Sequence, residues 1–464
     1  MANPTPMSPV LLSRYLGQQY PPTEQQAAVI GAEPGPLLVV AGAGAGKTET
    51  MAARVVWLVA NGYARPDEVL GLTFTRKAAQ EMGKRIRDRL GSLAQNADLV
   101  RRLDPSGELA KNLEVIAPTV ATYDAYAGEL IREYGLLVPV EPDARLITDA
   151  ELHAIATDVV VNYSGGLLTE LGSNPSLGTV VEDLLALSTA MGNELATPRW
   201  VREHAHDFLA ETESYPTGPR ARVEFTKVLT RWRSKQEERA KLLPLVEELD
   251  AELRRRGVVT FNEQMSVAAR LARDHRVVGA SQRSRFRVIM LDEYQDTSHA
   301  QRVLLRSLFG EGADPGLTVT AVGDPMQAIY GWRGATAANL EAFVDDFPAP
   351  QGAAPKKQLT TSWRNPPEVL ALANGVSDAV LGTGEARAVA ALQARPGAGA
   401  GDVVLGFFPE QDEEIAFVAE ELAREYQDAK QTGRAFSAAA LVRKNRHSPV
   451  LAAALEERGV PYEI

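Results

Sequence analysis

Short apolar runs recur along the chain, and most are followed by a longer segment whose apolar positions have helical spacing. The runs that predict buried strands are residues 37–40, 68–75, 113–122, 288–291 and 317–322. Strands that alternate with helices favour a parallel sheet, because near-continuous apolar runs need helices on both faces of the sheet. We therefore expect an α/β fold.

Helical periodicity replaces this pattern in the middle of the chain, which predicts an α-helical insertion within the α/β lobe. A Pro-rich linker composition at residues 348–355 precedes another α/β region, with strands expected at 403–408 and 438–442. The predicted domains are 1–142 and 257–347 for the two parts of the first lobe, 143–256 for the insertion and 348–464 for an incomplete second lobe. The chain stops part-way into a further strand-like run.

Composition excludes several classes of site. The 464 residues include no Cys, so disulfides, Cys-based zinc sites, iron–sulfur clusters and thiol catalysis are ruled out. The net charge of −11 argues against a protein that coats nucleic acid, although a local basic groove remains compatible with it. Neither a signal peptide nor a long apolar span is apparent, so we expect a cytoplasmic protein with no membrane partner.

A Gly- and Ala-rich turn follows the first strand and opens a helix. It matches the phosphate-loop pattern G-x-x-x-x-G-K-[ST], with Ala in place of the first Gly. The residues expected to bind ATP here are Ala41, Gly42, Ala43, Gly44, Ala45, Gly46, Lys47 and Thr48. Backbone N–H groups would surround the phosphates, Lys47 would reach the β- and γ-phosphates, and the Thr48 hydroxyl would bind Mg²⁺.

Two adjacent acids end the strand at 288–291. In a chain that already holds a phosphate loop, Asp292 can hold Mg²⁺ and Glu293 can orient and deprotonate the attacking water. Just past the next strand, Gln327 can sense the γ-phosphate through its amide. Upstream of the loop, Gln25 can recognise adenine, although a solvated surface glutamine is the alternative.

Aromatic, hydroxyl and basic side chains follow two of the predicted strands, at the edge where ligands bind in open α/β sheets. These residue types suit the bases and phosphates of a single strand. The candidate DNA-binding residues are Phe74, Thr75, Tyr330, Trp332 and Arg333. Taken alone, Phe74 is more typical of a core residue than of a stacking surface, and its position after the strand is what favours DNA.

Together, the phosphate loop and the motifs at 291–296, 323–335 and 362–364 closely resemble the UvrD/Rep/PcrA/RecB family of superfamily 1 DNA helicases. The resemblance implies two RecA-like lobes with ATP between them and 3′→5′ movement on single-stranded DNA. Within the family, the chain is most similar to AdnB-type motor subunits of actinobacterial AdnAB helicase–nucleases. That likeness implies double-strand-break processing, DNA ends or junctions as substrates, and a second, AdnA-like motor–nuclease subunit.

The family's residue roles transfer to matching positions. The resemblance implies that Gln25 recognises adenine, that Trp363 stacks on it in place of the usual Tyr, and that Arg364 reaches the γ-phosphate from the second lobe. It assigns the remaining ATP-site roles to Lys47, Thr48, Asp292, Glu293 and Gln327, and DNA contacts to Phe74, Tyr330, Trp332 and Arg333.

Three departures from the family pattern change these expectations. Asp124 stands where relatives often carry His near DNA, and Glu49 follows the loop where they often carry Arg. The remaining motifs, with a second arginine finger, do not occur before Ile464. Because an arginine finger can contribute roughly 10³–10⁵ in rate, we expect this chain alone to bind ATP weakly and hydrolyse it poorly.

Two alternatives remain open. A P-loop ATPase or kinase of another type would use Lys47 and Asp292 but would leave the aromatic segment around Tyr330 without a role. A truncated DNA-binding fragment would bind DNA with little or no ATPase activity. Stimulation of ATP hydrolysis by single-stranded DNA distinguishes both from a helicase motor.

Overall fold

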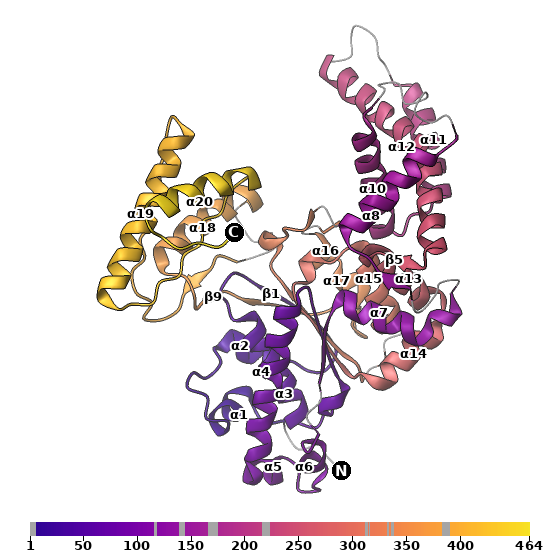
Figure 1. Cartoon of the computed structure of the whole chain (residues 1–464). Helices are drawn as coiled ribbons and strands as arrows, with labels where there is room; N and C mark the ends of the chain where they lie inside the picture. The colour runs from indigo at the N-terminus through magenta and orange to yellow at the C-terminus, as the bar shows by residue number, and fades with distance from the viewer. Residues whose placement is uncertain are drawn as a thin grey trace. The chain divides into compact units, whose positions relative to one another are not determined.

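The computed structural model describes residues 6–115, 118–138, 144–165, 175–215, 223–310, 314, 316–331, 334–335, 338–382 and 390–464. The chain divides into two compact units, Met1–Gly399 and Ala400–Ile464. The larger unit contains the central sheet (Figure 1).

Six parallel strands form this sheet in the described part of the larger unit, in the order β3-β2-β6-β7-β1-β8. Their bounds are β1 (Pro36–Ala41), β2 (Val69–Thr73), β3 (Thr119–Thr122), β6 (Val288–Leu291), β7 (Thr318–Gly323) and β8 (Lys356–Leu359). In register, Leu291 of β6 pairs with Leu72 of β2 on one side and Ala321 of β7 on the other. The carboxyl ends of the strands therefore share one edge, and the expected α/β fold with a parallel sheet is confirmed.

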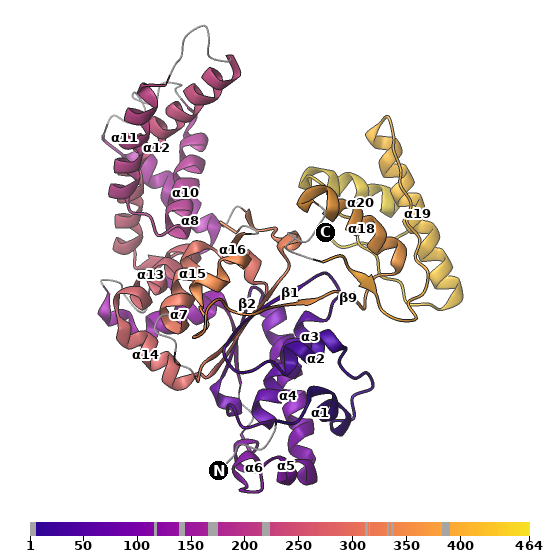
Figure 2. The same ribbon diagram turned by 180° about the vertical axis from the view of Figure 1, so that it is seen from behind.

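Successive residues of β1 enter different cores, since side chains alternate across a strand. Leu38 and Val40 belong to one buried cluster, whereas Leu37 and Val39 belong to another. The first cluster is covered by α7 (Tyr123–Tyr134), α13 (Phe261–Asp274), α14 (Arg276–Arg285) and α15 (His299–Phe309). The second is covered by α1 (Pro9–Tyr15), α2 (Glu24–Ile30), α3 (Lys47–Ala60), α4 (Arg76–Gln95), α5 (Ala97–Leu103) and α6 (Glu108–Asn112). Figures 1 and 2 show these helices on both sides of the sheet.

The strand predicted at 113–122 is shorter than expected. Only Thr119–Thr122 pair as β3, and residues 116–117 lie outside the described part of the chain. Leu109 and Leu113 are both buried in the same core cluster. Their spacing of four places them on one face of a helical turn, so Leu113 is the C-cap of the short helix α6 rather than part of a strand.

Between β4 (Arg145–Leu146) and β5 (Val258–Val259), the described residues form four helices that pack around a core of their own. They are α8 (Asp149–Asn162), α10 (Leu177–Asn193), α11 (Pro198–Glu213) and α12 (Val223–Arg255). The hydroxyls of Thr148, Ser176 and Thr197 accept backbone N–H groups in the first turns of α8, α10 and α11. The two short strands pair in parallel where the chain enters and leaves this helical layer.

Strand β8 follows the Pro-rich segment and pairs with β1, so the sheet continues beyond residue 347. The larger unit also contains α16 (Ala338–Glu341), α17 (Phe343–Asp346), α18 (Pro367–Leu381) and the parallel pair β9 (Thr361–Ser362) and β10 (Gln393–Ala394).

The smaller unit contains α19 (Gln411–Thr432) and α20 (Ser448–Glu457), which pack through Ala419, Leu451 and Leu455. The strands predicted at 403–408 and 438–442 are wrong, because neither segment pairs with another strand. Phe407 and Leu441 are instead 98% and 97% exposed. Apolar sequence alone does not make a strand where no neighbouring strand receives its backbone hydrogen bonds.

Candidate nucleotide-binding site

The loop between β1 and α3 has the geometry of an anion-binding turn. Gly44 and Gly46 adopt φ values of +75° and +79°, a left-handed conformation that glycine enters without steric cost. Gly46 is the N-cap of α3 and offers no side chain to the N–H groups of the first turn. These N–H groups and the helix dipole therefore face the position where the sequence predicts phosphate.

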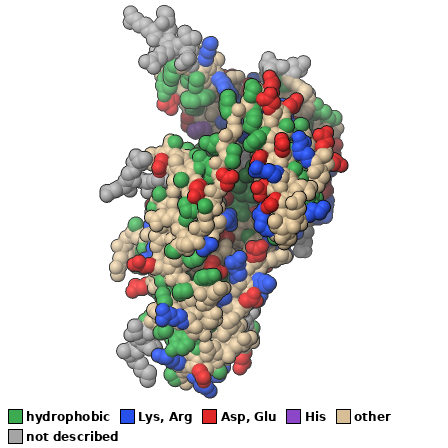
Figure 3. All heavy atoms as spheres, turned by 90° about the vertical axis from the view of Figure 1, so that its left-hand side faces the viewer, with side chains coloured by type: hydrophobic (Ala, Val, Ile, Leu, Met, Phe, Trp, Pro, Cys, Tyr) green, Lys and Arg blue, Asp and Glu red, His purple; other side chains and the backbone are tan. Residues whose placement is uncertain are grey.

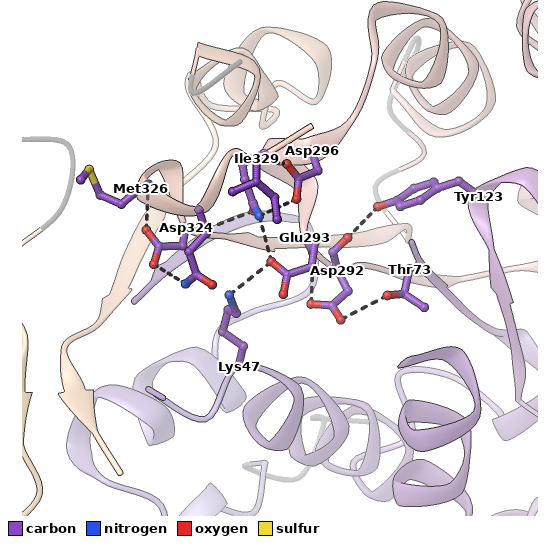
Figure 4. Close-up of polar contacts among 11 residues, drawn as sticks. Lys47, Thr73, Tyr123, Asp292, Glu293, Asp296, Asp324, Met326 and Ile329 are labelled. Carbon is purple, nitrogen blue, oxygen red and sulfur yellow. Dashed lines mark hydrogen bonds and ion pairs between the residues drawn. The ribbon is translucent and has the colours of Figure 1, made fainter. Parts of the chain in front are cut away.

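Lys47, the first residue of α3, contacts Glu293, which follows a strand two places away in the sheet. The Lys47 ammonium lies 3.2 Å from Oε2 of Glu293, and their side chains are 13% and 34% exposed. Figure 4 shows the two groups pointing toward each other beside Asp292. The structure thus joins the predicted phosphate-binding cation to the predicted base.

Asp292 is 5% exposed and is held by its neighbours on both oxygens. The Thr73 hydroxyl donates to Oδ2 at 3.4 Å, and the Glu293 backbone N–H donates to Oδ1 at 3.1 Å (Figure 4). Burial raises the pKa of Asp292 to about 6, with Glu293 acting in the same direction and Lys47 in the opposite one. A further cation near this carboxylate, in addition to Lys47, would favour its charged form and lower its pKa.

The backbone of Glu293 is strained. Its φ of +51° is one of two positive values among the described non-glycine residues. The left-handed conformation costs a side-chain-bearing residue roughly 1–2 kcal/mol, and such strain persists where surrounding contacts enforce it. The chain turns here as it passes from β6 into the short 3₁₀ helix Tyr294–Asp296, and the Glu293 side chain contacts Lys47.

The residues here fit Mg²⁺ held with a triphosphate. No group of three His, Cys, Asp or Glu side chains in the described part of the chain could hold a metal ion by itself. Mg²⁺ in nucleotide sites is held by one or two protein oxygens together with waters and phosphates. A buried carboxylate at Asp292 and the Thr48 hydroxyl beside the loop provide this donor set.

The predicted adenine reader is already hydrogen-bonded. Gln25 lies in the first turn of α2, which Thr23 caps as expected. Its amide oxygen accepts from the Thr360 backbone N–H at 2.9 Å, and its amide nitrogen donates to the Thr360 hydroxyl at 2.8 Å. Both halves of the amide are thus engaged by a residue 335 positions away.

Trp363 and Tyr20 present a second feature of this region. Their ring centroids lie 6.3 Å apart at an angle of 52°, and both rings are partly exposed. The pairing places the Trp363 ring beside the segment that leads into α2. Tyr20 was not among the predicted site residues, because an isolated Tyr in a Pro-rich segment carries no recognisable signal.

The segment around Trp363 is bonded directly to the phosphate loop. The Trp363 N–H donates to Gly44 O at 2.8 Å, and the Ser362 hydroxyl donates to Ala43 O at 3.1 Å. A Cβ at Gly44 would lie 2.7 Å from Ser362 Oγ and 2.8 Å from Arg364 Cβ. The backbone and Cβ of Arg364 are therefore adjacent to the loop.

Gln327 lies in a short 3₁₀ turn after β7 and is held by Asp324. Its amide nitrogen donates to Asp324 Oδ2 at 2.6 Å, while the Met326 N–H donates to Oδ1 at 3.0 Å. Figure 4 places Asp324 beside Lys47 and Glu293. Asp324 belongs to the motif at 323–335, but its hydrogen bond with Gln327 is apparent only in the structure.

The predicted DNA-binding rings meet at the same edge of the sheet. The rings of Phe74 and Tyr330 are nearly parallel, with centroids 5.9 Å apart and an angle of 9°. Phe74 also contacts Tyr123, with centroids 5.0 Å apart, and packs against the core. Thr75 is exposed and caps α4 by accepting from the Ala78 N–H. Trp332 and Arg333 lie outside the described residues.

The two replaced family positions have other partners. Glu49 forms ion pairs with Arg85, at 3.3 Å, and with Arg89 of α4. The Asp124 backbone carbonyl accepts from Gln264 at 2.7 Å. On the face drawn in Figure 3, acidic and basic side chains are intermixed. Among the side chains drawn in colour, that face shows no broad positive patch.

Comparison with protein families identifies one match. The UvrD/REP helicase N-terminal domain matches residues 22–348, which is more than two thirds of the chain. In the described part of the chain, every helix is too short or too polar to cross a bilayer.

Curated relatives agree with this match. ATP-dependent DNA helicase UvrD1 of Mycobacterium tuberculosis (strain H37Rv) is 28% identical over 459 residues, covering 96% of this chain and 49% of the relative. ATP-dependent DNA helicase PcrA of Staphylococcus epidermidis (strain RP62A) is 25% identical over 443 residues, covering 95% and 50%. The chain therefore spans about half the length of the curated relatives it matches.

Proposed function

The chain belongs to the UvrD/REP helicase family, and on that premise we propose that it is the motor part of an ATP-dependent 3′→5′ DNA helicase acting on single-stranded DNA. The relatives' names describe ATP-dependent DNA helicases. The observation that carries the proposal is the 3.2 Å contact of Lys47 with Glu293 at the sheet edge that also bears the Phe74–Tyr330 ring pair.

ATP hydrolysis at this site would use each group as follows. Lys47 and the N–H groups at the start of α3 bind the phosphates, while Asp292 and Thr48 hold Mg²⁺, which when bound neutralises charge on the phosphate oxygens. Glu293 accepts a proton from the attacking water as the bond to the γ-phosphorus forms and the bond to the leaving ADP oxygen breaks. Gln327 and Arg364 stabilise the γ-phosphate, and Gln25 and Trp363 bind adenine.

DNA would pass over the ring pair. Stacking of a base on an aromatic side chain contributes roughly 1–3 kcal/mol, and it tolerates any sequence. Phe74 and Tyr330 supply such surfaces, Thr75 supplies an exposed hydroxyl next to them, and we assign Trp332 and Arg333 to the same track.

We assign residues 1–142 and 257–347 to a first RecA-like lobe, 143–256 to a helical insertion and 348–464 to part of a second RecA-like lobe. The separate core of the helices between β4 and β5 supports the second assignment. Strand β8 is an exception to the last of these ranges, because it pairs with β1 and so belongs to the sheet of the first lobe.

A narrower assignment follows from the motif at 323–327 and the high Ala and Arg content. We propose an AdnB-like motor subunit that acts in the cytoplasm on DNA ends or junctions, processes double-strand breaks and pairs with an AdnA-like motor–nuclease subunit. Co-purification of the full-length protein with such a subunit, and nuclease activity of the pair, would test it.

The decisive experiment measures phosphate release by the chain with ATP and Mg²⁺, with and without single-stranded DNA. We expect stimulation by DNA that Lys47→Ala abolishes and that the exposed α4 control Lys84→Ala retains. DNA-independent hydrolysis would indicate another class of P-loop ATPase. DNA binding without turnover would favour the alternative of a DNA-binding fragment with little ATPase activity.

A further inference from the structure

Two buried side chains connect the acids to the ring pair, and the hydrolysis steps above assign them no role. Gln295 and Asp296 follow Glu293 in a 3₁₀ turn and are 1% and 5% exposed. Both side chains are too deeply buried to contact DNA or nucleotide directly. Their hydrogen bonds instead run along the sheet edge.

Gln295 contacts three partners through its amide. Its nitrogen donates to Glu293 Oε2 at 2.9 Å and to Asp296 Oδ2 at 3.2 Å. Its oxygen accepts from the Asp324 backbone N–H at 3.0 Å. The Glu293 oxygen that it contacts is the same Oε2 that contacts Lys47.

The backbone leaves room for this arrangement. A Cβ at Gly323 would lie 2.5 Å from Gln295 Oε1, closer than any side-chain carbon can approach without a shift. Gly323 at the end of β7 thus lets the Gln295 side chain pack directly against the strand.

Asp296 continues the chain of contacts to the ring pair. Its Oδ1 accepts from the Ile329 backbone N–H at 3.1 Å (Figure 4). Burial raises the pKa of Asp296, and the backbone N–H groups of Ile329 and Tyr330 lower it. The Tyr330 ring then stacks on Phe74. One carboxylate therefore sets the backbone from which the Tyr330 ring projects.

We infer that Gln295 and Asp296 are positioning residues that couple the phosphate site to the Phe74–Tyr330 ring pair, an inference that rests on the proposed function. With phosphate bound, Lys47 turns its charge from Glu293 toward the phosphate. Glu293 then accepts a stronger hydrogen bond from the Gln295 amide nitrogen, which also donates to Asp296. Because buried hydrogen bonds have no water to replace them, the change reaches the carboxylate that holds residues 329 and 330.

The test is a linkage measurement on the whole chain. The dissociation constant for a fluorescent oligo(dT) is measured with and without Mg²⁺ and a non-hydrolysable ATP analogue. Coupled sites typically change each other's affinity by roughly 5–150-fold. We expect a ratio in this range for wild type, and a ratio within about twofold of one for Asp296→Asn and Gln295→Met. By reciprocity, DNA must change the analogue's affinity by the same factor.

Gln282→Met is the matched control. Gln282 is also 1% exposed, and its amide contacts the hydroxyls of Tyr126 and Tyr134 away from this network. It should lose as much thermal stability as Gln295→Met while keeping the wild-type ratio. A role confined to folding would lower stability without changing the ratio in any variant.

The outcomes separate the two proposals. If wild type binds DNA and the analogue but shows a ratio of one, or if Asp296→Asn retains the wild-type ratio, the coupling proposal is overturned and the binding sites stand. If wild type binds neither ligand, the proposed function itself fails and takes the coupling proposal with it. Should Gln295→Met fail to fold, Asp296→Asn, which keeps the side-chain shape, decides the question.

Discussion

Lys47 and Glu293 are 246 positions apart in the sequence, and their side chains form an ion pair of 3.2 Å at the edge of the parallel sheet. The sheet order brings them together, since β7 is the single strand between β1 and β6. Without a nucleotide, each charge neutralises the other. A triphosphate that attracts Lys47 would therefore also release Glu293 for its proposed role as a base.

Glu293→Gln should bind nucleotide and fail to hydrolyse it. The amide keeps the shape and can still contact Gln295, but it cannot accept a proton from water. Equilibrium binding of a fluorescent ATP analogue, together with phosphate release, checks this. Glu81→Gln, an exposed substitution on α4, serves as control. Turnover by Glu293→Gln at the wild-type rate would remove Glu293 from the catalytic residues.

Asp292→Asn should stabilise the fold while abolishing Mg²⁺-dependent hydrolysis. The pKa of about 6 in the folded protein lies above the unfolded value of about 3.9, so the native state holds more protons between these values. The stability contributed by this group therefore falls as pH rises from about 4 to about 6. The substitution should raise the free energy of unfolding by about 3 kcal/mol near pH 8 and by about half as much near pH 5. Urea denaturation at both pH values measures it, and an equal gain at both would contradict the charge explanation.

Phe74→Ala and Tyr330→Ala should each weaken binding of single-stranded DNA by roughly 1–3 kcal/mol, because each removes a stacking surface. Fluorescence anisotropy with oligo(dT) gives the affinity. Tyr63→Ala removes a ring from another aromatic pair, with Trp57, and provides the control. Unchanged DNA affinity in both variants would mean that Phe74 is a core residue, the alternative left open by its sequence.

Thr360→Val should raise the affinity for adenine nucleotides. Valine cannot accept a hydrogen bond from the Gln25 amide nitrogen, so Gln25 loses one of its present partners and is freer to contact adenine. Gln25→Ala should instead reduce discrimination between ATP and GTP. Competition binding with the two nucleotides checks both. If Thr360→Val leaves ATP affinity unchanged and Gln25→Ala leaves the ATP-to-GTP ratio unchanged, Gln25 does not recognise the base.

Gly44→Ala should destabilise the protein more than Gly62→Ala. Both glycines have nearly the same positive φ, +75° and +76°, so the backbone strain is common to both substitutions. A Cβ at Gly44 would also meet Ser362 and Arg364, whereas one at Gly62 has nothing within 4 Å. Thermal unfolding of the two variants measures the difference. Equal losses would show that the contact between the loop and residues 362–364 contributes nothing to stability.

Local signals predicted the elements of the site well. The apolar run of β1 and the glycines after it define a turn whose geometry depends on residues that are neighbours in the chain, and Gly44 and Gly46 have the expected left-handed conformation. Asp292 and Glu293 follow β6 directly, so strand direction alone places them at the sheet edge. Residues 403–408 and 438–442 are the counterexample, since a strand needs a partner that its own sequence does not contain.

By itself, the sequence determined the parallel α/β sheet, the phosphate turn and the acids that end β6, because these follow from periodicity and from residues adjacent in the chain. Only the tertiary structure decided that Thr360 hydrogen-bonds to Gln25 and that Ser362 and Trp363 hydrogen-bond to the loop. It also decided that Gln295 and Asp296 connect the acids to the segment that carries Tyr330. Such partners are brought together by strand order, and a short-range pattern carries no information about which distant residue will offer the donor or acceptor that a buried polar group requires.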